Sequence, residues 1–284
     1  MVEQTLRRFV QRAQRRFVHA GIAQDEAAID AELLAMHALD WDRASLVTRW
    51  REPAPEGFAE RYADLTARRE AREPTAYIVG AREFYGRPFE VTPACLIPRP
   101  ETEELVSAAL EIAARFNASP RIVDVGTGSG CIAVTLALED PRAWIVAIDV
   151  SADALALARP NALRLGATRV TFVRGSLIEA IAPSGPSKAD GIDIIVSNPP
   201  YVPLGDRETL QPEVRDFEPA RALFAGDDGL AVIRALVEQA AVVLRSGGWL
   251  QFELGAGQAT QVDALIDPRA WALRATRPDL QGTP

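Results

Sequence analysis

Four consecutive residues, Asn198-Pro199-Pro200-Tyr201, bring together groups that can hold a planar amino group. Asn198 offers a side-chain carbonyl and Pro199 a backbone carbonyl, so two hydrogen-bond acceptors lie close together. The imide nitrogen of Pro200 carries no hydrogen, and Tyr201 offers a flat π face. The alternative is an ordinary turn leaving a strand, because proline pairs are common in turns.

The chemistry that suits this motif is transfer of a group to nitrogen. An –NH2 on a planar group is a poor nucleophile because its lone pair is delocalised. Two acceptors that hold its two hydrogens can turn the lone pair toward an electrophile, and such orientation lowers a barrier by up to ~7 kcal/mol. A methyl group on a sulfonium can then be attacked in line without a strong base. The only histidines, His19 and His37, lie in helical patterns far from this motif.

A glycine-rich loop, VDVGTGSG from Val123 to Gly130, follows a predicted strand and opens a predicted helix. Gly126, Gly128 and Gly130 allow the backbone to approach a ligand at a helix N-terminus. Asp124 at the end of the strand would repel a pyrophosphate. It suits a ligand with an amino or cationic group, and S-adenosylmethionine carries both an ammonium and a sulfonium.

A second acidic residue, Asp149, ends the next predicted strand. A carboxylate at this position can accept hydrogen bonds from both ribose hydroxyls, which fits NAD as well as S-adenosylmethionine. An NAD oxidoreductase, however, leaves Asn-Pro-Pro-Tyr unexplained. A nucleoside cofactor is therefore predicted, and S-adenosylmethionine is favoured.

These residues need strands that deliver them to one edge of a sheet. From residue 100 onward, strand-like runs alternate with helical segments, which is typical of an α/β fold with a parallel sheet covered on both faces. Ligands of such sheets bind outside the carboxyl ends of the strands. The predicted strands are 121–125, 143–149, 169–175, 193–198, 247–254 and 271–276.

Residues 1–80 show helical spacing instead and predict a small all-helical unit. A hairpin with Gly86-Arg87 between two short β-like runs is predicted to follow it. The predicted apolar faces are Leu6, Phe9, Val10 and Phe17 in the first helix and Ile29, Leu33, Met36 and Leu39 in the second.

Composition excludes several classes of protein. Hydrophobic residues make up 48% and charged residues 25% of the 284 residues, the profile of a globular protein. A net charge of -8 argues against nucleic acid as the main partner, although the arginines of residues 6–17 form a local basic patch. Two unrelated cysteines, Cys95 and Cys131, predict neither a disulfide scaffold nor a metal site. No membrane span and no export signal are expected, which favours a cytoplasmic location.

The glycine loop and Asn-Pro-Pro-Tyr together resemble those of amino-methyltransferases that use S-adenosylmethionine. The segments LIPRPETEELV (Leu96–Val106) and FEPARALFAGDDGL (Phe217–Leu230) are similar to the release factor glutamine N5-methyltransferases, the HemK/PrmC family. The resemblance runs from about residue 74 to 255. It implies methyl transfer to the side-chain N5 of the glutamine in the Gly-Gly-Gln loop of peptide chain release factors, which would be the protein partners.

The resemblance also implies an architecture and roles for residues. A helical domain (1–80) would dock the release factor, a hairpin linker would span 81–97, and a Rossmann-like class I methyltransferase domain would span 98–284. Asn198, Pro199 and Tyr201 would be catalytic, and Asn198, Pro199, Pro200 and Tyr201 would bind the glutamine. Arg99, Pro100, Glu101 and Thr102 would pack over the pocket, although Glu101 is also explained as a salt-bridged residue at a helix start. The cofactor site would comprise Asp124, Gly126, Thr127, Gly128, Ser129, Gly130, Asp149, Ser176, Leu177 and Asn198.

The sequence departs from the family pattern at two places. Ser176 and Leu177 stand where the family often has Asp followed by Trp beside the adenine, and the chain stops at Pro284, where a last sheet strand usually follows. The long connection 199–228 predicts an ordered lid or docking loop rather than a solvated one. Two rival functions stay open: an N-methyltransferase acting on an exocyclic amino group of DNA or rRNA, and a noncatalytic S-adenosylmethionine-binding partner protein. No stable nucleic acid binding is expected.

Overall fold

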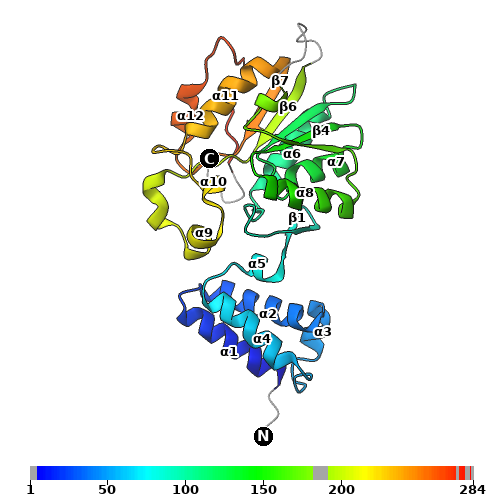
Figure 1. Cartoon of the computed structure of the whole chain (residues 1–284), viewed down its shortest axis with the longest axis vertical. Helices are drawn as coiled ribbons and strands as arrows, with labels where there is room; N and C mark the ends of the chain where they lie inside the picture. Colours follow the sequence, from blue (N-terminus) through cyan, green and yellow to red (C-terminus); the bar gives the residue numbers. More distant parts are fainter. Residues whose placement is uncertain (1–4, 182–190, 273–274, 279–281, 283–284) are drawn as a thin grey trace. The chain divides into compact units, whose positions relative to one another are not determined.

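The computed structural model of the chain describes residues 5–181, 191–272, 275–278 and 282. The chain divides at Gly80 into two compact units (Figure 1). By its contacts, the short segment Gln211–Phe217 belongs with the first of them. The boundaries predicted from the sequence left this segment in the catalytic domain. Its assignment depends on contacts between residues about 140 positions apart, which local patterns do not report.

The helical unit is built on a single apolar core. Leu6, Val10 and Phe17 of its first helix are buried and Phe9 packs against them, as predicted. Phe58 stacks on Tyr62 with ring centroids 4.9 Å apart, and the Tyr62 hydroxyl donates to the backbone oxygen of Ala31. The helices are α1 (Leu6–His19), α2 (Gln24–Leu39), α3 (Arg43–Thr48), α4 (Phe58–Glu70), α5 (Thr75–Val79) and α9 (Pro212–Phe217).

The predicted apolar face of α2 was wrong in its first half. Ile29 is 60% exposed and Leu33 is 39% exposed, whereas Met36 and Leu39 pack against the core. The buried face carries mostly small residues: Ala27, Asp30, Ala31, Leu34, Ala35 and Ala38. Apolar residues surround this helix almost completely, so periodicity alone does not select a face, and the alanines allow α1 and α4 to pack closely.

The second unit is a parallel α/β sheet preceded by a hairpin (Figure 1). The hairpin strands are β1 (Ala81–Phe84) and β2 (Arg87–Glu90). The sheet strands are β3 (Arg121–Val125), β4 (Trp144–Asp149), β5 (Val170–Arg174), β6 (Ile192–Ser197) and β7 (Leu244–Phe252). The helices are α6 (Thr102–Ala113), α7 (Cys131–Glu139), α8 (Ala152–Leu165), α10 (Ala220–Leu223), α11 (Ala231–Val243) and α12 (Ala259–Leu265), with 3-10 turns η1 (Glu179–Ile181) and η3 (Leu204–Thr209).

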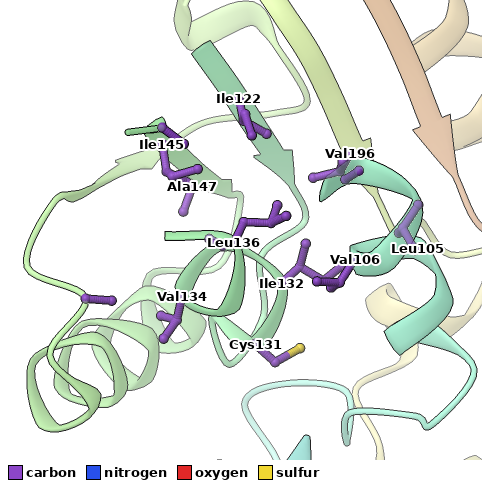
Figure 2. Close-up of a cluster of buried hydrophobic side chains, with 14 of the residues drawn as sticks. Leu105, Val106, Ile122, Cys131, Ile132, Val134, Leu136, Ile145, Ala147 and Val196 are labelled. Atoms are coloured by element: carbon purple, nitrogen blue, oxygen red, sulfur yellow. The ribbon is translucent and has the colours of Figure 1, made fainter. Parts of the chain in front are cut away.

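The sheet order β5-β4-β3-β6-β7 places β3 and β6 side by side in the middle. Alternate residues of these strands face opposite layers. Ile122 and Val196 meet α6 and α7, as Figure 2 shows around Ile132 and Leu136 of α7. Val123, Ile195 and their neighbours instead pack against Leu236 and Ala240 of α11. The predicted Rossmann-like fold with a helical N-terminal unit and a hairpin is confirmed.

The hairpin is held on the second unit by side chains of two helices. Its turn residues, Tyr85 and Gly86, have φ of +53° and +70°, the positive values that two-residue hairpin turns favour. Asn161 of α8 accepts from the backbone nitrogen of Glu90 and donates to its oxygen, at 2.9 and 3.0 Å. Glu103 of α6 accepts from the backbone nitrogen of Tyr85 at 2.8 Å. The hairpin is therefore an anchored part of this unit.

The strand predicted at 271–276 was wrong for the described residues of that stretch. Trp271, Ala272, Ala275 and Thr276 are not in a strand, and residues 273–274 lie outside the described part of the chain. Trp271 packs instead against the apolar cluster of α11 and α12, which includes Ile233 and Val262. Among the described helices, none combines the length and the apolar character needed to cross a membrane.

Candidate functional site

The glycine loop connects the end of β3 to the start of α7. Gly126 and Gly128 have φ of +77° and +57°, a backbone conformation that residues with a Cβ rarely adopt. Gly130 is also limited by space, because an added Cβ would lie 3.2 Å from the Cβ of Ala158 in α8. The backbone nitrogens of Gly126 and Thr127 both donate to the oxygen of Ile148, at 2.8 and 2.9 Å, which ties the loop to β4.

Asp124 lies under this loop and is fully buried. Its Oδ2 accepts from the Thr127 hydroxyl at 2.6 Å and from the backbone nitrogen of Ala133 at 3.2 Å, so one oxygen holds the loop and the helix start. Its Oδ1 has no partner among the described residues. Burial raises the pKa of Asp124 to about 7, although the two hydrogen bonds lower it. An unpartnered carboxylate oxygen here is suited to a cationic donor.

Asp149 ends β4 beside the same loop. Its Oδ2 accepts from the backbone nitrogen of Gly128 at 2.9 Å, and its Oδ1 accepts from that of Ser151 at 2.8 Å. Each carboxylate oxygen has a second lone pair, so both oxygens keep the capacity to accept from a diol. The structure thus brings the predicted ribose residue into contact with the predicted cofactor loop.

The carboxyl end of β6 lies directly beside the glycine loop. Val125 pairs with Ser197 across the two strands, and the Ser197 hydroxyl donates to the Val125 oxygen at 2.7 Å. As a result, a Cβ placed on Gly126 would lie 3.9 Å from the backbone oxygen of Asn198. The two motifs that stood 72 residues apart in the sequence therefore meet at the centre of the sheet edge.

Asn198 is oriented by side chains from two other elements. Its Nδ2 donates to the hydroxyl of Thr102 at 3.0 Å, and that hydroxyl donates to Oε2 of Glu253 at 2.9 Å. Thr102 begins α6 and is 2% exposed, while Glu253 directly follows β7. Because Nδ2 of Asn198 points toward Thr102, the side-chain oxygen Oδ1 of Asn198 points away from Thr102.

Tyr201 is held between a glycine and an apolar cluster. A Cβ on Gly229 would lie only 2.3 Å from the Tyr201 backbone oxygen, and Gly229 has φ of +73°. That oxygen also accepts from Nε2 of Gln258 at 2.9 Å. The ring packs against the cluster that contains Leu230, and burial, together with the charge of Glu253, raises the pKa of Tyr201. Pro199 is buried and Pro200 is half-buried.

The predicted pocket-covering residues behave differently from one another. Arg99 forms an ion pair with the buried Glu218, whose pKa is raised by burial in spite of that pairing. Glu101 precedes the first turn of α6 and makes no ion pair within the described residues, so the salt-bridge interpretation of Glu101 gains no support. Thr102, which was expected only to pack, makes the hydrogen bonds described above.

Ser176 and Leu177 follow β5 at the same sheet edge. The backbone nitrogen of Gly175 donates to the oxygen of Asp149 at 3.0 Å, which places this turn next to the predicted ribose residue. Leu177 has φ of +49° and packs partly against the core under α11. The turn at the predicted adenine side is therefore adjacent to Asp149, and direct roles for Ser176 and Leu177 stay predictions.

A cavity of about 780 Å³ lies beside Tyr201 and Glu253. Glu101, Tyr201, Glu253 and Gly255 line part of it, and residues of α6, β7, α12 and the segment from Trp271 to Pro278 line the rest. The glycine loop and Asp149 are not among its lining residues.

The connection 199–228 carries regular structure, with η3, α9 and α10 along it. Its two ends are joined, because the backbone nitrogens of Val202 and Leu204 donate to the oxygens of Leu223 and Gly226, both at 2.9 Å. An ordered connection was predicted, whereas its role in docking a release factor stays a prediction.

Glu253, Gly229 and Gly255 lie against Thr102 or Tyr201 and were not predicted from the sequence. The position of Glu253 in the sequence could have indicated it, because Glu253 directly follows a strand of the same sheet, as Asn198 does. A Cβ on Gly255 would lie 3.1 Å from Cδ2 of Tyr201, a contact that only the folded chain creates.

Comparison with known proteins agrees with this geometry. Residues 9–80 match the model described as PrmC N-terminal domain, and residues 104–211 match the methyltransferase small domain. The release factor glutamine methyltransferase of Geobacter sulfurreducens is 47% identical over 84% of this chain and 80% of its own. That of Nitratidesulfovibrio vulgaris is 41% identical over 98% of this chain and 92% of its own.

One solved structure is also similar in sequence to this chain. It is the release factor-specific protein-(glutamine-N5) methyltransferase of Alicyclobacillus acidocaldarius, 33% identical over 68% of this chain and 93% of its own, with a TM-score of 0.40. The resemblance found in the sequence motifs is confirmed. The chain therefore belongs to the release factor glutamine methyltransferase family.

Proposed function

We propose that this chain transfers a methyl group from S-adenosyl-L-methionine to the side-chain N5 of the glutamine in the Gly-Gly-Gln loop of peptide chain release factors. Two relatives that cover most of the chain are named for release factor glutamine methylation. The observation that carries the proposal is the orientation of Asn198, whose Nδ2 is held by Thr102 beside the glycine loop.

The residues of the cofactor loop fit S-adenosyl-L-methionine. Oδ1 of Asp124 is buried without a partner, and an ammonium group would supply both a donor and a compensating charge. Gly126 and Gly128 present backbone rather than side chain, and Asp149, which accepts from the Gly128 backbone nitrogen, would also accept from ribose hydroxyls. When bound, this cofactor supplies an electrophilic methyl group on a sulfonium.

The chain's own residues orient the glutamine amide. Oδ1 of Asn198 and the backbone oxygen of Pro199 accept from the two hydrogens on N5, which turns the nitrogen lone pair toward the methyl group. The ring of Tyr201 provides the flat surface for the carboxamide. Orientation of this kind supplies several kcal/mol, about 7 at most. The proton lost from N5 can leave after transfer, so no histidine is required at the site.

A glutamine on a protein loop also accounts for the overall charge. A substrate without a phosphate backbone does not need a basic surface, and the net charge here is -8. In this proposal the helical unit docks the release factor and the protein works in the cytoplasm, where translation termination takes place.

The test is a comparison of substrates with methyl-labelled S-adenosyl-L-methionine. Purified release factor, the same factor with the Gly-Gly-Gln glutamine replaced by asparagine, unmodified DNA and ribosomal RNA are incubated in parallel. We expect label only in the unaltered release factor, in the peptide that contains Gly-Gly-Gln. Label in nucleic acid alone would replace the proposal by the exocyclic-amine alternative, and cofactor binding without any transfer would support the noncatalytic one.

Asn198→Ala tests the residue that carries the proposal. We expect the affinity for S-adenosyl-L-methionine to stay near that of the wild type and turnover to fall by ~10² or more, because positioning is lost. Asn117→Ala, which removes an exposed asparagine, is the matched control. Wild-type turnover in Asn198→Ala would remove Asn198 from the mechanism.

A further inference from the structure

Three side chains from distant parts of the second unit are hydrogen-bonded in series. Nδ2 of Asn198 donates to Oγ1 of Thr102 at 3.0 Å, and Oγ1 of Thr102 donates to Oε2 of Glu253 at 2.9 Å. They come from the end of β6, the start of α6 and the end of β7. The middle member is almost fully buried, so water has little access to the hydroxyl that connects the other two.

The direction of this series depends on the charge of Glu253. An ionised carboxylate only accepts, so the single hydrogen of the Thr102 hydroxyl must point to Glu253. Thr102 can then only accept from Asn198, which forces the NH2 group of that amide toward Thr102. A protonated Glu253 can donate to Thr102 instead, and Thr102 can then donate to Oδ1 of an amide that has flipped.

The two orientations of Asn198 have opposite consequences for an amino substrate. With NH2 toward Thr102, Oδ1 is left to accept an N–H of the substrate. In the flipped amide, NH2 would face the substrate –NH2, and two donors would meet without an acceptor. A donor left unsatisfied in a buried site is unfavourable, so the flipped form binds this substrate poorly.

We propose that Glu253, acting through Thr102, is a positioning residue that sets the Asn198 amide with its oxygen toward the substrate. This inference rests on the proposed function only in requiring an acceptor substrate with an –NH2 group on a planar carrier. It adds Glu253 and Thr102 to the residues on which turnover depends, and it assigns the ionised form of Glu253 as the active one.

The surroundings of Glu253 make its ionisation sensitive to pH near neutrality. Burial raises the pKa of Glu253 to about 7, the hydrogen bond from Thr102 and the charge of Arg99 lower it, and the charge of Glu101 raises it. The charge of Glu253 in turn raises the pKa of Tyr201. As pH rises through about 7, Glu253 becomes ionised and the active orientation is selected.

Kinetics of single and double variants test the series. We expect Glu253→Gln and Thr102→Val each to lower kcat by ~10- to 100-fold with little change in the Kd of S-adenosyl-L-methionine. The double variant should be no slower than the slower single variant, because both changes break one series. Thr102→Ser should recover most of the kcat lost in Thr102→Val. The matched control is Thr135→Val, which changes a buried threonine on α7 whose hydroxyl has no partner among the described residues.

The pH dependence of kcat distinguishes a positioning role of Glu253 from a merely structural role, which would leave that dependence unchanged. In the wild type, kcat should rise with pH through an apparent pKa near 7, and this limb should be absent in Glu253→Gln. The pKa of Asp124 is also raised to about 7, but Asp124 is unchanged in Glu253→Gln. A pH dependence caused by Asp124 would therefore persist in that variant. Wild-type kcat and an unchanged pH limb in Glu253→Gln would overturn the proposal, as would additive effects in the double variant.

A spectroscopic experiment on the free enzyme makes the result independent of the substrate. The chain has three asparagines, Asn117, Asn161 and Asn198, so selective 15N-asparagine labelling yields few side-chain NH2 signals. The Asn198 signal, assigned by its loss in Asn198→Ala, should shift with a midpoint near pH 7 in the wild type and not in Glu253→Gln. An Asn198 signal that does not respond to pH, or that responds equally in Glu253→Gln, would refute the series even if release factor methylation is confirmed. If nucleic acid proves to be the substrate instead, the Asn198 NMR signal and the kinetics of the single and double variants, measured with that substrate, test the same inference.

Discussion

Replacing Glu213 by alanine tests whether a buried charge network holds α9 in the helical unit. Glu213 accepts from Nη1 of Arg69 at 2.7 Å and from Nε and Nη2 of Arg72 at 2.7 and 2.6 Å. The Arg69 side chain is 1% exposed and also donates to Asp30 and Glu26. These contacts join α9 to α4 and α2, although α9 lies about 140 residues further along the chain.

The expected loss of stability depends on which hydrogen-bond partners Arg69 and Arg72 keep in Glu213→Ala. Removing one partner of a buried ion pair costs about 3–5 kcal/mol. Arg69 keeps Asp30 and Glu26, and Arg72 is 20% exposed and keeps the backbone oxygen of Ala20, so we expect the lower end, about 3 kcal/mol. Since 1.36 kcal/mol corresponds to a factor of ten, local opening of α9 should become about 100-fold more frequent.

Hydrogen exchange measured by mass spectrometry on the full chain reads this opening directly. Amides in peptides that cover 211–217 should lose about two orders of magnitude of protection in Glu213→Ala, while peptides from β3 should not change. Asp206→Asn removes an exposed carboxylate from the same connection and is the control. Unchanged protection of 211–217 in Glu213→Ala would refute the reasoning that this ion network anchors α9.

The charge state of Glu213 adds a pH dependence with a definite sign. Burial raises the pKa of Glu213, but hydrogen bonds from Arg72 and Arg69 outweigh it, so the net pKa is lowered from 4.5. A lowered pKa in the folded state contributes stability above about pH 4.5, and this contribution is lost as pH falls below it. The difference in unfolding free energy between wild type and Glu213→Ala should therefore shrink in acid.

Two further predictions concern the second unit. Gly229→Ala should destabilise the chain by about 2 kcal/mol or more and lower turnover, because a Cβ would lie 2.3 Å from the Tyr201 backbone oxygen at a φ of +73°. Thermal unfolding and kcat measure these two effects. The control is Gly205→Ala, where an added Cβ meets no atom within 4 Å. Asp124 has a raised folded-state pKa, so it lowers the free energy of unfolding as pH rises from about 4 to about 7. Asp124→Asn should make this fall shallower, while the fall caused by the raised pKa of Glu253 remains. A pH dependence as steep in Asp124→Asn as in the wild type would contradict this prediction.

The helices, the strands and most of the candidate site follow from local patterns. Alternating strands and helices put the carboxyl ends of β3, β4 and β6 at one edge, so Gly126, Asp149 and Asn198 had to lie near one another once the sheet was parallel. The glycines of the loop were readable for the same reason, because a turn with positive φ selects them locally.

Partnerships between distant segments were decided only by the tertiary structure. The apolar pattern of α2 is nearly continuous around the helix, so its buried face depended on how closely α1 and α4 approach its alanines. The same limit applies to Glu213, whose buried arginine partners lie about 140 residues away, and to Glu253, whose neighbour Thr102 starts a helix on another layer. Periodicity and turn chemistry are local properties of the chain, whereas hydrogen bonds between far-separated side chains exist only after the layers have packed.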